Sequence, residues 1–106
     1  MKPRKYRNQP ITIDGLRFDS QAEARRWQQL KLLERAGVIL ELQRQVTFPI
    51  AWNGTKICSY RADFVYRETA TGEQVIEDVK GMLTPEYRIK AKLMAAQGMP
   101  VTEVRS

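Results

Sequence analysis

The sequence has no histidine and only one cysteine, Cys58, among its 106 residues. The lack of histidine excludes Ser-His and Cys-His nucleophile pairs and histidine-based zinc catalysis. A single cysteine can form neither an internal disulfide nor a C-x-x-C zinc site, which fits a reducing cytoplasm. No apolar run approaches the roughly 20 residues of a membrane span, and the N-terminus lacks the apolar core of a secretory signal. We therefore expect a cytoplasmic protein that does not enter a membrane.

Basic residues are in excess, and this favours a polyanionic partner. Eighteen lysines and arginines face twelve acidic residues, a net charge of +6. We expect residues 11–106 to form one domain, because 42% hydrophobic and 28% charged residues are typical of a globular chain. Residues 1–10 are polar and basic and predict a flexible arm that could follow a phosphate backbone. Its basic side chains are Lys2, Arg4, Lys5 and Arg7. A solvated tail without function is an equally good interpretation.

Turn and cap signals divide the domain into helices and strands. They predict a hairpin over 11–18, a helix from 20 to 37, strands over 38–50, 56–68 and 74–81, a helix from 84 to 98, and a strand over 101–104. The three middle strands are joined by short turns and must be antiparallel. The third and last are joined by a helix, so they pair in parallel through a right-handed crossover. The fold class is therefore α/β, with a mixed sheet flanked by helices.

Two of the predicted strands carry acids inside apolar stretches. In "VIEDVKG" (75–81), Asp78 and Lys80 share one face, because side chains alternate along a strand. Glu77 points to the other face and is expected at the surface or as a support for the site. Asp63 lies in "YRADFVY" of the preceding strand. If these strands are neighbours, Asp63 and Asp78 converge.

Such a pair of carboxylates predicts a metal site. Two close carboxylates repel each other, and a hard divalent cation removes that cost. Mg²⁺, with Mn²⁺ as a substitute, commonly uses one or two carboxylates, several waters and a substrate phosphate. Lys80 would then orient or deprotonate an attacking water, or neutralise charge on the phosphate. A structural salt bridge between Lys80 and one of the two aspartates is the plainer alternative, and it is favoured when the motif is taken alone.

The ordered set resembles the PD-(D/E)XK nuclease superfamily, with Asp63 and Asp78-Val79-Lys80 as its motif and Ala62 in place of the proline. The blocks "FDSxxEA", "ADFxY" and "VxEDVKG" are similar to those of small phage and prophage proteins of uncertain role, and the likeness spans residues 6–105. The broader pattern also resembles endonuclease I of a lytic coliphage, which cuts branched DNA. The resemblance implies a restriction-endonuclease-like αβββαβ core and a Mg²⁺-dependent DNA endonuclease. We expect a homodimer, because cutting a duplex or a junction needs two sites.

The resemblance also assigns Glu23, in the first helix, to the metal site beside Asp63 and Asp78. As the third residue after the cap Ser20, Glu23 could instead accept a hydrogen bond from the Ser20 N–H in a capping box. We expect the two roles to compete, and we favour the site. Beyond the arm, the candidate DNA contacts are Arg61, Arg88, Lys90 and Lys92. The alternative for Arg61 is pairing with a nearby acid, and the alternative for the other three is a solvated basic face. Gln43 and Gln45 could contact substrate, but we expect them to be ordinary sheet residues. A non-catalytic nucleic-acid-binding module, or a subunit of a phage recombination or packaging complex, is the alternative function.

Overall fold

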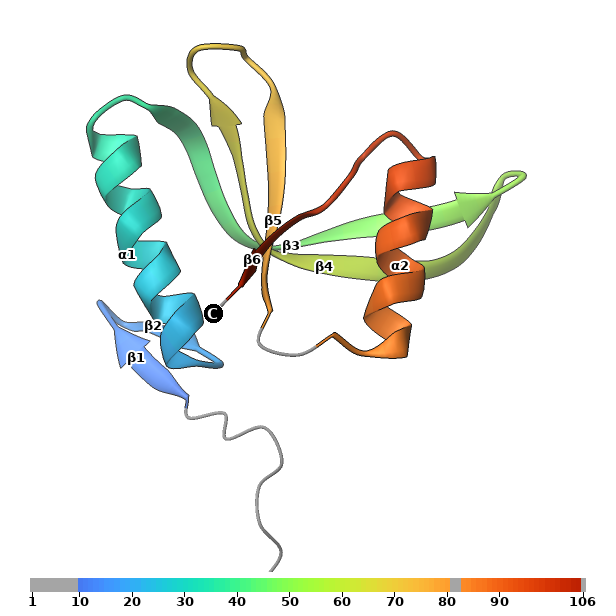
Figure 1. Cartoon of the computed structure of the whole chain (residues 1–106), viewed down its shortest axis with the longest axis horizontal. Helices are drawn as coiled ribbons and strands as arrows, with labels where there is room; N and C mark the ends of the chain where they lie inside the picture. Colours follow the sequence, from blue (N-terminus) through green and yellow to red (C-terminus); the bar gives the residue numbers. More distant parts are fainter. Residues whose placement is uncertain (1–9, 81–82, 106) are drawn as a thin grey trace, which may run out of the picture.

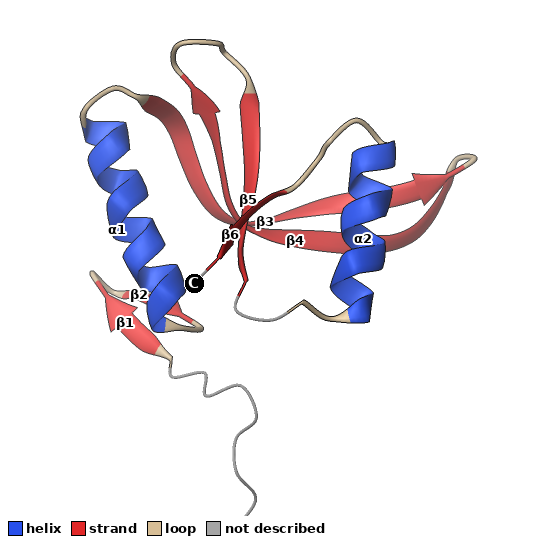
Figure 2. Ribbon diagram, in the orientation of Figure 1, coloured by secondary structure: helices blue, strands red, loops and turns tan. Residues whose placement is uncertain are grey.

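The computed structural model describes residues 10–80 and 83–105, which form two helices, a four-stranded mixed sheet and a separate two-stranded hairpin (Figures 1 and 2). The elements are β1 (Ile11–Ile13), β2 (Leu16–Phe18), α1 (Gln21–Arg35), β3 (Ile39–Trp52), β4 (Thr55–Glu68), β5 (Gln74–Lys80), α2 (Pro85–Ala96) and β6 (Thr102–Arg105). The basic residues of the predicted arm, Lys2, Arg4, Lys5 and Arg7, lie outside the described residues. No helix in the described ranges is long and apolar enough to cross a membrane.

The strand order in the sheet is β3-β4-β5-β6. The first three strands pair antiparallel, and β5 pairs in parallel with β6. This confirms the predicted α/β class and mixed sheet. Local chemistry accounts for the connections: Asn53 and Gly54 take φ angles of 50° and 80° in the β3–β4 turn, as a tight hairpin requires. Thr84 caps α2 by accepting the Tyr87 N–H, and Pro85 follows at the first helical position.

Two hydrophobic clusters lie on opposite sides of the sheet. One packs beneath α1 and the β1–β2 hairpin, and the other packs beneath α2 (Figure 1). The α1-side cluster contains Phe18, Ala24, Leu30, Ile39, Phe64 and Tyr66. The α2-side cluster contains Ile50, Tyr60, Ala62, Val65, Ile76, Tyr87 and Met94. Phe64 and Val65 are neighbours in β4 and enter different clusters, so the sheet itself separates the two.

The alternation of side chains along β4 changes phase at Asp63. Tyr60 and Ala62 pack on the α2 side, whereas Phe64, two residues further on, packs on the α1 side. Opposite this point, Gln45 of β3 has a φ of 56°, and the ladder pairs on either side of it are Arg44 with Phe64 and Val46 with Ala62. A left-handed backbone at a non-glycine residue costs of order 1–3 kcal/mol and persists only where the surroundings impose it. Both strands bend here (Figure 1), and the bend sets the position of Asp63.

Candidate active site

The structure brings Asp63 and Asp78 together, as the strand order predicted. The β4–β5 ladder pairs Phe64 with Glu77, which places Asp63 across from Asp78 at the end of the pairing. The backbone N–H of Val79 donates to Asp63 Oδ2 over 2.9 Å and holds this carboxylate against β5. Asp78 is buried, with 3% of its surface exposed, and Asp63 is half-buried. Two acids from neighbouring strands therefore meet where the sheet bends.

Glu23 enters the same cluster from the first turn of α1. It is 4% exposed, and Ser20 caps the helix as predicted, with its Oγ accepting the Glu23 N–H over 3.1 Å. The expected return bond to the Ser20 N–H is wrong: Glu23 Oε1 accepts instead from the Asp19 N–H over 2.9 Å. The other oxygen, Oε2, faces β3 and accepts from Gln45 Nε2 over 3.0 Å. One carboxylate thus serves both the helix end and the site, with one oxygen for each, so the expected competition between the two roles does not arise.

The three carboxyl groups interact strongly. Burial raises the pKa of Glu23, and hydrogen bonding and charge from Asp63 add to this effect. Together they bring the pKa to about 7. Burial likewise raises the pKa of Asp78 to about 7, again with contributions from Asp63. The Tyr60 hydroxyl, which donates to Asp78 Oδ2, and the Lys80 ammonium oppose this shift. Asp63 is therefore the shared neighbour of two acids whose charged forms are disfavoured.

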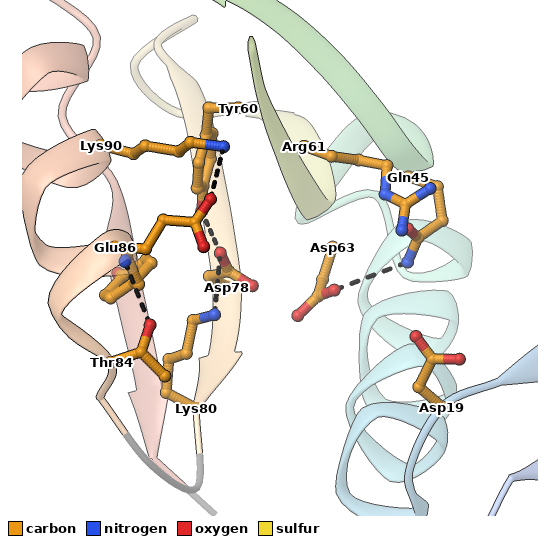
Figure 3. A pocket seen from close by; sticks show the side chains of 11 residues that line it. Asp19, Gln45, Tyr60, Arg61, Asp63, Asp78, Lys80, Thr84, Glu86 and Lys90 are labelled. Carbon is orange, nitrogen blue, oxygen red and sulfur yellow. Dashed lines mark hydrogen bonds and ion pairs between the residues drawn. The ribbon is translucent and has the colours of Figure 1, made fainter. Parts of the chain in front are cut away.

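A pocket of about 280 Å³ opens beside Asp63 and Asp78 (Figure 3). Its lining side chains are Asp19, Gln45, Tyr60, Arg61, Asp63, Asp78, Lys80, Thr84, Glu86, Tyr87 and Lys90. Lys80 Nζ lies 3.6 Å from Asp78 Oδ2 and 4.2 Å from the centre of the Tyr87 ring. The salt bridge that the sequence allowed therefore exists, and it lies at the wall of the pocket rather than in the core. A cation–π contact and an ion pair together direct the ammonium group toward the acids.

The predicted DNA contacts divide into two groups. Arg61 and Lys90 line the pocket, whereas Arg88 and Lys92 are exposed on α2 outside its lining. Lys90 pairs with Glu86 over 3.3 Å. Within residues 10–80 and 83–105, no salt bridge involves Arg61, and its side chain is exposed. Among the described cations that line the pocket, Arg61 is thus the one that no salt bridge pairs, and its charge is available to an anionic ligand.

The donor set fits a hard divalent cation. Asp63 and Asp78 offer carboxylate oxygens at the pocket, and bound positive charge would offset the repulsion that raises the Asp78 pKa. In the part of the chain that the structure describes, no three acidic, histidine or cysteine side chains form a complete metal cage. Mg²⁺ does not require one, because water and substrate phosphate commonly complete its octahedron. Glu23 does not line the pocket, so its direct ligation stays a prediction, and the geometry supports a positioning role through Asp63.

Sequence reasoning missed Gln45 and Tyr60. Gln45 bridges the cluster, since its Nε2 lies 3.0 Å from Glu23 Oε2 and 3.5 Å from Asp63 Oδ1. The run of three polar residues from 43 to 45, which breaks the alternation of the strand, was the available signal. Tyr60 gives no such signal, because a tyrosine in an apolar strand looks like core. Gln43 is exposed and lies outside the pocket lining, so its role as an ordinary sheet residue stays a prediction.

Glu77 is not a surface residue. It is 1% exposed and forms a two-pronged ion pair with Arg26 of α1, with Nε–Oε1 at 2.9 Å and a terminal nitrogen to Oε2 at 2.6 Å. The Tyr66 hydroxyl also donates to Oε2. Of the two expected positions, the one at the surface is wrong because α1 covers this face of β5, and a supporting role for the site stays a prediction. Arg26 lies one turn after Glu23, and Glu77 precedes Asp78, so this ion pair sets the position of Glu23 relative to β5.

Comparison with known proteins places the chain in a family. No curated protein matches it. One family profile matches residues 3–105, almost the full length. The match spans every element that forms the pocket, from the helix with Glu23 to the strand with Lys80 and the helix with Lys90. The chain belongs to the family described as "Protein of unknown function (DUF1064)".

Proposed function

We propose that this protein is a metal-dependent DNA endonuclease with a restriction-endonuclease-like core. The observation that carries the proposal is the joint position of Asp63, Asp78 and Lys80 at one pocket, with Glu23 behind them. The element order helix, three strands, helix and strand agrees with the order that the PD-(D/E)XK resemblance implies. A protein that only binds DNA would gain nothing from gathering acids whose charges repel both each other and phosphate.

In this proposal, Asp63 and Asp78 hold Mg²⁺ or Mn²⁺. Such a cation stabilises charge on the phosphate and lowers the pKa of a bound water. Lys80 lies close enough to Asp78 to orient the attacking water or to neutralise charge on the phosphate. Gln45 and the Val79 N–H fix Asp63, and the Tyr60 hydroxyl fixes Asp78. Arg61 holds a neighbouring phosphate, and the products carry 5′-phosphate and 3′-hydroxyl ends.

A cleavage assay tests the proposal. The protein is incubated with labelled linear, nicked and four-way-junction DNA in Mg²⁺, in Mn²⁺ and in EDTA. We expect cleavage only with a divalent cation. We also expect a homodimer that cuts both strands of a junction, and sedimentation measures its mass. Glu73→Gln is the matched control, because it removes an exposed carboxylate outside the pocket lining and should cut at the wild-type rate. Cleavage that persists in EDTA, or no cleavage of any substrate in either metal, would contradict the proposal.

Glu23→Gln separates the site role of Glu23 from its role at the helix end. Glutamine keeps an oxygen for the Asp19 N–H, but its amide nitrogen replaces the oxygen that accepts from Gln45, so one hydrogen bond worth about 1 kcal/mol is lost and the melting temperature should fall by only a few degrees. The charge that helps to organise Asp63 is lost, and we expect cleavage to fall by about 10²-fold or more at saturating DNA. Rate and thermal melting are measured on the same preparation. If the variant cuts at the wild-type rate, Glu23 is only a cap and the two strands alone build the site.

A further inference from the structure

The far half of the β3–β4 hairpin, residues 46–62, packs against α2 on one face and ends in a turn beyond this helix. Figure 1 shows its turn projecting past α2. Val46, Phe48 and Ile50 of β3 pack toward α2, as do Cys58 and Tyr60 of β4. The alternate residues must therefore point to the opposite face of the hairpin. These are Thr47, Pro49 and Ala51 of β3 and Lys56, Ser59 and Arg61 of β4, because a register shift between Ile50 and Ala51 pairs Ala51 with Lys56 and leaves Ile57 as the extra residue. All except Ser59 are exposed.

The charged residues of this hairpin are all basic. Residues 42–62 contain Arg44, Lys56 and Arg61 and no acidic residue, in a chain with twelve acids. In the described ranges, neither Lys56 nor Arg61 takes part in a salt bridge. Arg61 also lines the catalytic pocket, so the exposed face begins at the proposed site. An uncompensated basic strip of this kind complements a phosphate backbone.

The end of the hairpin carries Trp52, which is 70% exposed beside the Asn53-Gly54 turn. Thr55, its ladder partner, lies six positions before Arg61 on β4, about 20 Å at roughly 3.3 Å per residue. At the rise of about 3.4 Å per nucleotide in a stacked strand, this distance is at most about six nucleotides, because an extended unpaired strand covers more length per nucleotide. An exposed indole lowers solubility and favours contacts with other molecules, so it is expected where a flat apolar ligand binds. Nucleobases offer such a surface along a phosphate chain.

We infer that residues 46–62 form a DNA-binding arm, in which Lys56 and Arg61 hold phosphates and Trp52 stacks on an unpaired base at most about six nucleotides from the phosphate at Arg61. The inference rests on the proposed nuclease function and deepens it, because it names DNA with an unpaired segment as the substrate class. Stacking on one aromatic side chain is worth about 1–3 kcal/mol per base. Opening a paired base costs a few kcal/mol, which one tryptophan does not offset. A base that is already unpaired is therefore the ligand that fits.

Binding without cleavage tests this arm. Full-length protein is titrated in EDTA against a labelled 12-nucleotide oligothymidine and a fully paired duplex of equal length, at one fixed salt concentration. Trp52→Ala should weaken single-strand binding by about 5- to 100-fold and change duplex binding by less than about twofold. Trp52→Tyr should retain most of the affinity. Ile89→Ala is the matched control, because it removes a side chain of α2 that is 60% exposed and should leave both affinities unchanged.

Tryptophan fluorescence gives a second readout. Trp27 is half-buried, with its ring 6.0 Å from the rings of Phe18 and Phe64, so quenching by oligothymidine should come from Trp52 and vanish in Trp52→Tyr. Three results would overturn the inference: wild-type affinity of Trp52→Ala for the single strand, an equal loss on the duplex, or a change of sedimentation with unchanged DNA binding, which would mark a protein interface. Because EDTA prevents metal-dependent cutting, failure of the nuclease proposal does not affect this measurement.

Discussion

Asp78→Asn is expected to reduce DNA cleavage by about 10³-fold or more while DNA binding persists. Asparagine preserves the shape of the side chain and can still accept the Tyr60 hydroxyl proton, but it removes the charge that faces Lys80 and the pocket. Losing a single group that stabilises transition-state charge commonly costs 10²–10³-fold, and loss of a metal ligand adds to this. Binding should remain because phosphate contacts elsewhere supply most of the affinity. Single-turnover cleavage and binding in EDTA measure the two quantities separately.

The same variant has a pH signature that does not depend on activity. The pKa of Asp78 is about 7 in the folded protein against an ordinary value of 3.8, so between these values the native state holds a proton that the unfolded chain has lost. The contribution of Asp78 therefore makes stability fall as the pH rises from about 4 to about 7, and the penalty is complete above pH 7. Asp78→Asn should melt higher than wild type at pH 8 by more than it does at pH 5. Mg²⁺ should raise the wild-type melting temperature mainly at pH 8 and have little effect on the variant.

Two outcomes would contradict this account of Asp78. Wild-type cleavage by Asp78→Asn would show that the acid is structural, and an equal response of both proteins to Mg²⁺ would show that the cation binds elsewhere. Glu73→Gln again provides the control, because it removes one exposed negative charge without changing the pocket. Its melting temperature should respond to Mg²⁺ as the wild-type value does.

Arg26→Met is expected to lower the free energy of unfolding by about 3–5 kcal/mol. It leaves the Glu77 carboxylate buried at 1% exposure without its cation, and breaking a buried pair from one side typically costs this amount. For a domain of this size, each kcal/mol corresponds to roughly 4–8 °C in melting temperature. Since α1 also carries Glu23, cleavage should fall as the helix loses its position against β5. Urea unfolding and cleavage are measured together.

Lys31→Met is the matched control for this prediction, because it removes a cation from the same helix. Lys31 forms an exposed pair with Glu34 over 3.4 Å, which should be worth less than about 1 kcal/mol. Combining Arg26→Met with Glu77→Leu and Tyr66→Phe should recover most of the stability, since apolar residues of similar volume often replace a buried ion pair without loss, and Tyr66→Phe avoids leaving the Tyr66 hydroxyl without its acceptor. If Arg26→Met is no more harmful than Lys31→Met, the ion pair does not hold α1.

Local sequence signals determined the order of elements and most of their ends. Ser20, Asn53-Gly54 and Thr84-Pro85 act within three or four residues of themselves, so their effect can be inferred without the tertiary structure. The convergence of Asp63 and Asp78 could also be predicted. It needs only that two strands joined by a short turn pair with each other, which brings both acids to the same end of the ladder; the change of phase at Asp63 came from the structure alone.

Only the tertiary structure decided how the acids are held. Glu77 meets a cation 51 residues away, Tyr60 meets an acid 18 residues away, and Gln45 links two acids from different elements through a left-handed backbone. None of these contacts follows from local spacing, because each depends on how a helix packs on the sheet or where a strand changes phase. The packing of helices on the sheet also decides whether a charged residue is exposed or buried. The sequence showed Glu77 as a charge on the outer side of a strand, and the packing of α1 on that side made it a buried ion pair.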